Sequence, residues 1–108
     1  MSKDPQILAT VKEVLDLIKN ISPGKSVELR VPPYGAIQCV AGSNHRRGTP
    51  PNTVEMSGQT LIRLINEPAL WITLCESGEV RASGLLSDLS NVFFQVAVKY
   101  RAKRLDLA

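Results

Sequence analysis

Aromatic residues and histidine are scarce in this chain. Phenylalanine, tryptophan and tyrosine together make up 5% of its 108 residues, and there is a single histidine. Proteins that bind single-stranded nucleic acid stack bases on exposed aromatic rings, and few rings are present here. The net charge of +3 is also small for a dedicated nucleic-acid binder. We therefore expect no nucleic-acid partner.

Cysteine is equally sparse, and its placement argues against metal binding. Cys39 and Cys75 lie far apart among apolar neighbours, and the chain has no CxxC pair. One histidine does not complete a usual zinc site with them. We expect two buried free thiols, no metal and no cofactor.

Long apolar runs are missing as well. The N-terminus has no basic start followed by an apolar stretch, as a secretion signal would require. No apolar run approaches the length needed to span a bilayer. We expect a cytoplasmic protein without a transmembrane segment.

The composition is that of an ordinary globular domain, with 44% hydrophobic and 21% charged residues. A chain of 108 residues is the size of one domain, so we expect a single domain over residues 1–108. Its end, residues 97–108, is a basic tail that contains Lys99, Arg101, Lys103 and Arg104 and can fray. Cations near a helix C-terminus are favoured by the helix dipole, although they also suit an acidic surface.

Apolar spacing predicts the order of the secondary structure. Asp4 and Pro5 are typical of a helix start, and apolar residues then recur every three or four positions as far as Ile18. Strands are predicted at 27–31, 36–41, 53–56 and 80–83, and we expect the second to be covered on both faces. Short helices follow Ser57 and Pro68, with Gly78 as a left-handed cap, and a last helix begins at Ser87 or Asp88. This order favours an α+β fold with helices on a small, largely antiparallel sheet.

The segment His45-Arg46-Arg47-Gly48-Thr49-Pro50-Pro51-Asn52 concentrates charge between two predicted strands. Two guanidinium groups and an imidazole could bind a carboxylate or phosphate, with Gly48 allowing close backbone approach. The same residues could equally form a solvated loop that pairs with Glu28 or Glu55. The chain has no Gly-x-Ser-x-Gly elbow, no paired-carboxylate motif and no Walker loop, so we expect no enzyme and no catalytic residue.

Three blocks of sequence resemble one known family. They are VELRVPPYGAIQC at 27–39, HRRGTPPN at 45–52 and VRASGLLSDLS at 80–90. The chain is similar over residues 27–94 to the bacterial sterol-carrier-protein-like family. The resemblance implies a sterol-carrier-like fold with a twisted sheet of four to five strands, and in the wider superfamily this fold encloses an apolar cavity for acyl chains or sterols.

The resemblance therefore implies a non-enzymatic, lipid-binding carrier domain for a fatty acyl or sterol-like ligand. An apolar pocket is expected between the short helices, the sheet and the last helix, lined by Leu61, Ile65, Trp71, Leu74, Leu89, Phe93 and Val96. The polar end of a ligand would lie at His45, Arg46 and Arg47. The alternative is a protein-interaction or structural module with a filled core, in which an open sheet edge receives a protein partner or a second copy.

Overall fold

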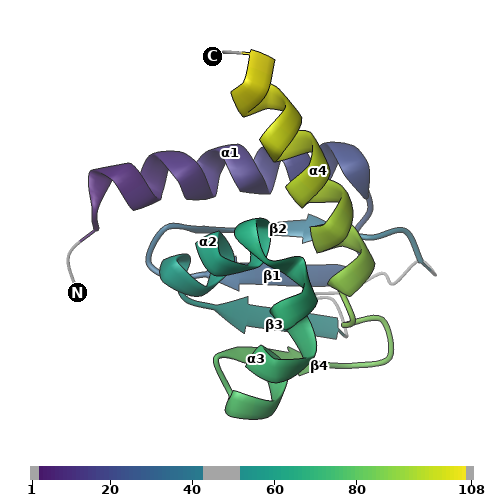
Figure 1. The fold of residues 1–108 in the computed structure, drawn as a ribbon. Helices are drawn as coiled ribbons and strands as arrows, with labels where there is room; N and C mark the ends of the chain where they lie inside the picture. Colours follow the sequence, from purple (N-terminus) through teal and green to yellow (C-terminus); the bar gives the residue numbers. More distant parts are fainter. Residues whose placement is uncertain (1–2, 43–51, 107–108) are drawn as a thin grey trace.

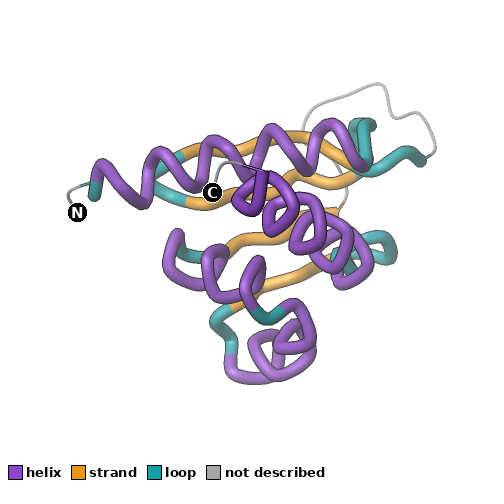
Figure 2. The backbone as a smooth tube through the Cα atoms, turned by 45° about the horizontal axis from the view of Figure 1, so that its top comes forward, coloured by secondary structure: helices purple, strands orange, loops and turns teal. Residues whose placement is uncertain are grey.

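The computed structural model describes residues 3–42 and 52–106, which form a four-stranded sheet with helices on one of its faces (Figure 1). Figure 2, turned by 45°, shows the same two layers. The elements in chain order are α1 (Pro5–Ile21), β1 (Val27–Val31), β2 (Gly35–Cys39), β3 (Asn52–Met56), α2 (Gly58–Asn66), the 3₁₀ turn η1 (Pro68–Leu70), α3 (Trp71–Ser77), β4 (Val80–Ser83) and α4 (Ser90–Asp106).

The strands lie in the order β2-β1-β3-β4, so β1 and β3 are central and β2 and β4 form the edges. β1 runs antiparallel to β2, with Leu29 opposite Ile37, and parallel to β3, with Leu29 opposite Val54. β3 and β4 are antiparallel. Two of the three pairings are antiparallel, and the predicted α+β fold with a largely antiparallel sheet is confirmed.

The alternating sequence of β1 places its side chains on two different surfaces. Val27, Leu29 and Val31 are fully buried beneath the helices, whereas Glu28 and Arg30 lie on the opposite face of the sheet. β3 repeats this pattern of burial. The core therefore fills the space between one face of the sheet and the helices, and the other face is polar.

The second strand differs from its prediction. β2 is an edge strand in which only Cys39 is buried, so the expectation of cover on both faces was wrong. It also ends at Cys39, two residues earlier than predicted, because Val40 takes a positive φ of 68°. The backbone of Val40 instead bonds Ser22 and Ser26, which lie between α1 and β1.

Local capping fixes the start of α1. The Asp4 Oδ1 atom accepts hydrogen bonds from the backbone N–H groups of Gln6 at 2.8 Å and Ile7 at 3.3 Å. This is the N-cap predicted from the Asp-Pro pair. The buried stripe of α1 then packs against the sheet and α4.

α4 extends well beyond the buried apolar residues in its first half. It packs on both α1 and α2, and the basic segment that begins at Ala97 continues the same helix to Asp106. Within residues 3–42 and 52–106, none of the helices combines the length and the apolar character needed to cross a membrane.

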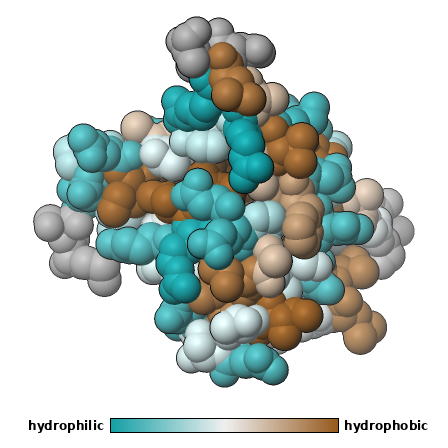
Figure 3. Space-filling view, viewed as in Figure 1, coloured by the Kyte–Doolittle hydropathy of each residue, from teal (hydrophilic) through white to brown (hydrophobic). Residues whose placement is uncertain are grey.

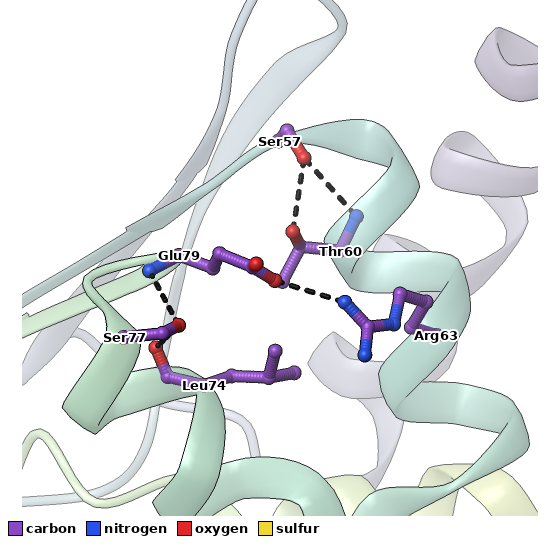
Figure 4. A network of polar contacts seen from close by, with 6 residues as sticks. All are labelled: Ser57, Thr60, Arg63, Leu74, Ser77 and Glu79. Carbon is purple, nitrogen blue, oxygen red and sulfur yellow. Dashed lines mark hydrogen bonds and ion pairs between the residues drawn. The ribbon is translucent and has the colours of Figure 1, made fainter.

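A polar network holds α2 and α3 in place (Figure 4). The Ser57 Oγ atom accepts from the N–H of Thr60 at 3.1 Å, which caps α2. Arg63 of α2 donates to Glu79 at 2.9 Å, and Ser77 caps the turn that leads from α3 into β4. Gly78 closes α3 in the predicted left-handed conformation, with φ of 84°.

Candidate ligand groove

All seven residues expected to line an apolar pocket lie together in the core. Each is at most 5% exposed, and they come from α2, α3, α4 and the residue before α4: Leu61, Ile65, Trp71, Leu74, Leu89, Phe93 and Val96. The rings of Trp71 and Phe93 stack with their centroids 5.9 Å apart and their planes at 30°. These side chains therefore contact each other and form part of the domain's own interior.

Beside Trp71, the surface opens into a groove of about 470 Å³ between the η1–α3 segment and the start of α4. Ligand sites for small molecules commonly have volumes of several hundred Å³. The groove is lined by Pro68, Ala69, Trp71, Ile72, Cys75, Glu76, Asp88, Ser90 and Phe94.

Exposed apolar side chains form the walls of this groove. Ile72 on α3 is 69% exposed and Phe94 on α4 is 47% exposed, although both are large hydrophobic residues. Trp71 is only 5% exposed and therefore forms the floor. Trp71 belongs to the pocket predicted from the sequence, whereas Ile72 and Phe94 were not among the predicted site residues.

The polar groups in the groove are acidic. The Asp88 carboxylate accepts from the N–H of Ser90 at 2.9 Å, and hydrogen bonds from Ser90 hold the pKa of Asp88 below its usual value. Burial raises the pKa of the Cys75 thiol, and the charges of Asp88 and Glu76 raise it further. Among the described residues no cation lines this groove, so it repels a carboxylate and suits an uncharged polar group.

The predicted anion site cannot be compared with the structure, because His45, Arg46 and Arg47 lie outside the described residues. Asn52, at the end of the same sequence block, is described and is buried. Its Nδ2 donates to the Ser26 carbonyl at 2.8 Å, and its Oδ1 accepts from the Leu86 N–H at 3.0 Å.

Asn52 therefore connects three segments of the chain, and Gly84 packs against it. Gly84 has φ of 107°, and a Cβ atom at this position would collide with the Asn52 side chain. In the sequence, Asn52 was noted only as the last residue of the block HRRGTPPN, which resembles the bacterial sterol-carrier-protein-like family. The available signals were a polar residue at the start of a strand and a glycine directly after another strand.

A second groove, of about 440 Å³, lies at the β4 side of the sheet and reaches its polar face. Glu55 pairs there with both Arg30 and Arg81, and Arg30 also pairs with Glu28. These charges compensate each other across neighbouring strands, so the ion pairs explain them without a ligand.

Similarity to known proteins extends over most of the chain. The family model described as bacterial SCP ortholog matches residues 4–94. A solved structure named UbiJ-SCP2 Ubiquinone synthesis protein is similar with a TM-score of 0.51 and 18% sequence identity, over 91% of this chain and 94% of that one. A likeness at this level of identity shows a shared fold. The search of curated proteins found no match.

Proposed function

Because this chain belongs to the family of bacterial orthologues of sterol carrier protein (SCP), we propose that it is a non-catalytic carrier domain that binds a sterol-like or fatty acyl ligand. The observation that carries this proposal is the groove over Trp71. Its walls expose Ile72 and Phe94 to solvent, and covering such side chains with an apolar ligand is favourable.

The acidic rim narrows the chemistry of the ligand. The hydroxyl of a sterol or a long-chain alcohol can donate a hydrogen bond to the Asp88 carboxylate. A fatty acid brings a second negative charge close to Asp88 and Glu76, which is unfavourable unless its carboxylate turns towards water. We therefore expect uncharged apolar ligands to bind more tightly than fatty acids of the same chain length.

Trp71 is the single tryptophan of the chain, so its fluorescence reports directly on the groove. A sterol or a long-chain alcohol should change its emission in a saturable manner. The corresponding fatty acid should bind about tenfold more weakly at neutral pH, as expected for about 1.4 kcal/mol of repulsion. A Glu76→Gln, Asp88→Asn double variant should remove most of this difference.

Two single variants test whether the groove is the binding site. Ile72→Ser changes a wall of the groove, while Leu85→Ser removes a fully exposed apolar side chain from the β4–α4 loop and is the matched control. Binding should weaken only in the Ile72 variant. Absence of any saturable response, together with no lipid in native mass spectra of gently purified protein, would contradict the proposal.

A protein-interaction module is the second candidate, and the packing of the core favours it. The seven residues expected to line a pocket are buried against each other, and β2 and β4 are the two edges of the described sheet. An edge strand can pair with a strand of another protein. Light scattering and partner capture test this candidate, and a strict monomer that captures no protein and binds lipid would count against it.

A further inference from the structure

α4 carries apolar side chains on two different sides. One side includes Phe93 and Val96, which are fully buried against the body of the domain. On another side, Phe94, Val98 and Leu105 are 47%, 69% and 70% exposed. The second side therefore presents large apolar side chains that nothing in the described part of the chain covers.

The spacing on the exposed side is typical of a helix that packs against another helix. Phe94, Val98, Arg101 and Leu105 follow one another at intervals of four, three and four residues, which places them along one side of the helix. Alternating intervals of three and four are the pattern by which two helices pack along their length. We call these four residues the α4 seam.

The charges around the α4 seam are separated along its length. At its start, Phe94 lines the groove over Trp71, and the exposed residues Glu76 and Asp88 line the same groove. Arg101, which is also exposed, lies one turn before the end of the seam. Figure 3 shows apolar surface along α4 and over α3 on one face of the molecule. This face is therefore acidic at one end, basic at the other and apolar between them.

The basic residues that follow Arg101 are already paired within the chain. Glu13 of α1 pairs with Lys103 at 3.5 Å and with Arg104 at 3.2 Å. The Arg104 guanidinium also donates to the Tyr100 hydroxyl at 2.6 Å. Arg101 has no ion-pair partner within residues 3–42 and 52–106. The seam therefore offers this guanidinium to another molecule.

A second copy of the chain complements this surface. In a two-fold contact each interaction occurs twice, so one surface must hold both partners of every pair. If two α4 helices lie antiparallel, with the two-fold axis between Phe94 and Arg101, the Arg101 of each copy faces Phe94 of the other. Its guanidinium then lies at the groove that Glu76 and Asp88 line. A parallel contact would instead bring Arg101 against Arg101, which is unfavourable.

Polyanionic partners fit this surface less well. An anionic membrane or a nucleic acid would attract Arg101 but would repel Glu76 and Asp88, which lie on the same face. A second copy satisfies charges of both signs and covers the apolar side chains between them. We propose that this chain forms a two-fold dimer through the α4 seam, in which the helices are antiparallel and Arg101 of each copy pairs with Glu76 or Asp88 of the other.

The proposed dimer has a consequence for ligand binding. It covers Ile72 and Phe94, the same side chains that an apolar ligand in the groove would cover. Ligand and second copy therefore compete, and each weakens the binding of the other to the same extent. This consequence rests on the proposed function, whereas the dimer itself does not.

Sedimentation velocity over a range of protein concentrations tests the dimer directly. The parent protein should show a reversible equilibrium between monomer and dimer. A Val98→Ser, Leu105→Ser double variant should raise the dissociation constant at least tenfold, because it removes two exposed apolar side chains of the seam. Leu85→Ser removes an equally apolar, exposed side chain from the β4–α4 loop and should dimerise as the parent does.

A charge exchange tests the proposed ion pairs. Arg101→Glu should raise the dissociation constant at least tenfold, because it places a carboxylate against Glu76 and Asp88. Adding Glu76→Lys to the same chain should restore most of the affinity, while Asp88 stays unchanged because it accepts from the Ser90 N–H. Lys12→Glu makes the same change of charge on the exposed side of α1 and should have no effect. All variants should melt alike by circular dichroism.

Disulfide cross-linking tests the antiparallel orientation. In a Cys75→Ser background, Val98→Cys places a thiol close to the two-fold axis, whereas Leu105→Cys places the two thiols about 20 Å apart along the helices. A disulfide requires Cα atoms within about 7 Å of each other. Mild oxidation should therefore link copies that carry Val98→Cys at least tenfold faster than copies that carry Leu105→Cys.

Several results would overturn the dimer. These are a monomer at every concentration, undiminished dimerisation of the Val98, Leu105 variant, no recovery on charge exchange, and equal cross-linking at the two positions. A long-chain alcohol should weaken the parent dimer, and binding of the alcohol without this effect would refute the shared surface. A dimer that binds no alcohol would contradict the ligand alone, whereas a strict monomer that binds it would contradict the dimer alone.

Discussion

Asn52 joins three parts of the fold through one side chain, and its removal gives a sharp test of the structure. It donates to the Ser26 carbonyl before β1 and accepts from the Leu86 N–H in the loop before α4, while its own backbone begins β3. Asn52→Ala removes both hydrogen bonds and leaves their partners in place.

The expected loss follows from the burial of each partner. A neutral hydrogen bond contributes about 1 kcal/mol net, and a buried group left without a partner costs about 1–3 kcal/mol. Ser26 is only 4% exposed, so its carbonyl stays dry, whereas Leu86 is exposed and its N–H can bind water. We expect Asn52→Ala to lower the free energy of unfolding by about 2–4 kcal/mol, a large share of the ~5–15 kcal/mol typical of a domain.

Urea denaturation followed by Trp71 fluorescence measures this loss as a lower midpoint at an unchanged slope. Asn91→Ala is the matched control, because Asn91 is exposed on α4, and it should change the free energy of unfolding by less than about 0.5 kcal/mol. If the two alanine variants are equally stable, the connecting role of Asn52 is refuted.

Asn52→Asp gives the same test a pH dependence. The variant keeps an oxygen for the Leu86 N–H but places a buried carboxylate beside the Ser26 carbonyl, which raises the pKa of the new carboxyl in the folded state. The protonated carboxyl can donate to Ser26, so the stability of the variant relative to the parent protein is greatest below the ordinary aspartate pKa of about 3.9 and falls as pH rises. A difference between variant and parent that instead shrinks towards neutral pH would contradict this assignment.

Four further predictions concern Cys39, Gly84 and Glu13. Burial raises the pKa of the Cys39 thiol to about 11, so at pH 8 a thiol reagent should modify the half-buried Cys75 first, and equal rates would contradict the structure. The same raised pKa predicts that stability falls as pH rises from about 9 towards 11, and that Cys39→Ser abolishes this fall. Gly84→Ala should cost at least about 2 kcal/mol in urea denaturation, but less in an Asn52→Ala background, because that variant removes the closest contact while the approach to the Asn52 backbone and the positive φ remain. Glu13→Gln should cost no more than about 1 kcal/mol, since its cationic partners are exposed, and the cost should shrink with salt.

Elements governed by neighbouring residues could be predicted from the sequence. The start of α1 depends on a side chain that bonds amides two and three residues away, so Asp4-Pro5 was sufficient to place it. The end of α3 depends on a residue that tolerates positive φ, and Gly78 supplied it. Both predictions are confirmed because the interactions that decide them are local.

Burial of a strand depends on its neighbours in the sheet, and here the sequence misled. Residues 36–41 are apolar except for Gln38, a pattern that favoured a strand covered on both faces. In the structure β3 pairs with β1 on the side opposite β2, which leaves β2 at the edge. Cys75, also expected to be buried, is half-buried because it lies where α3 meets the groove.

The candidate groove was only partly predictable, for a related reason. The two residues of the last helix that were expected to line the pocket, Phe93 and Val96, are indeed buried. Phe94, Val98 and Leu105 lie on another side of the same helix, and their spacing was visible in the sequence. What the sequence could not provide is the position of α1 and α2, which decides which of the two sides becomes the interior.

A helix with two apolar sides is costly for a protein that has no use for the second one, because exposed apolar surface favours non-specific association. Polar residues at Val98 and Leu105 would leave the core of this domain unchanged, since neither side chain contributes to it. Phe94, on the same side of α4 as Val98 and Leu105, also belongs to the groove, where it and Ile72 are exposed beside the buried Trp71. A ligand bound in the groove would cover Ile72 and Phe94, which removes part of this exposed apolar surface from water.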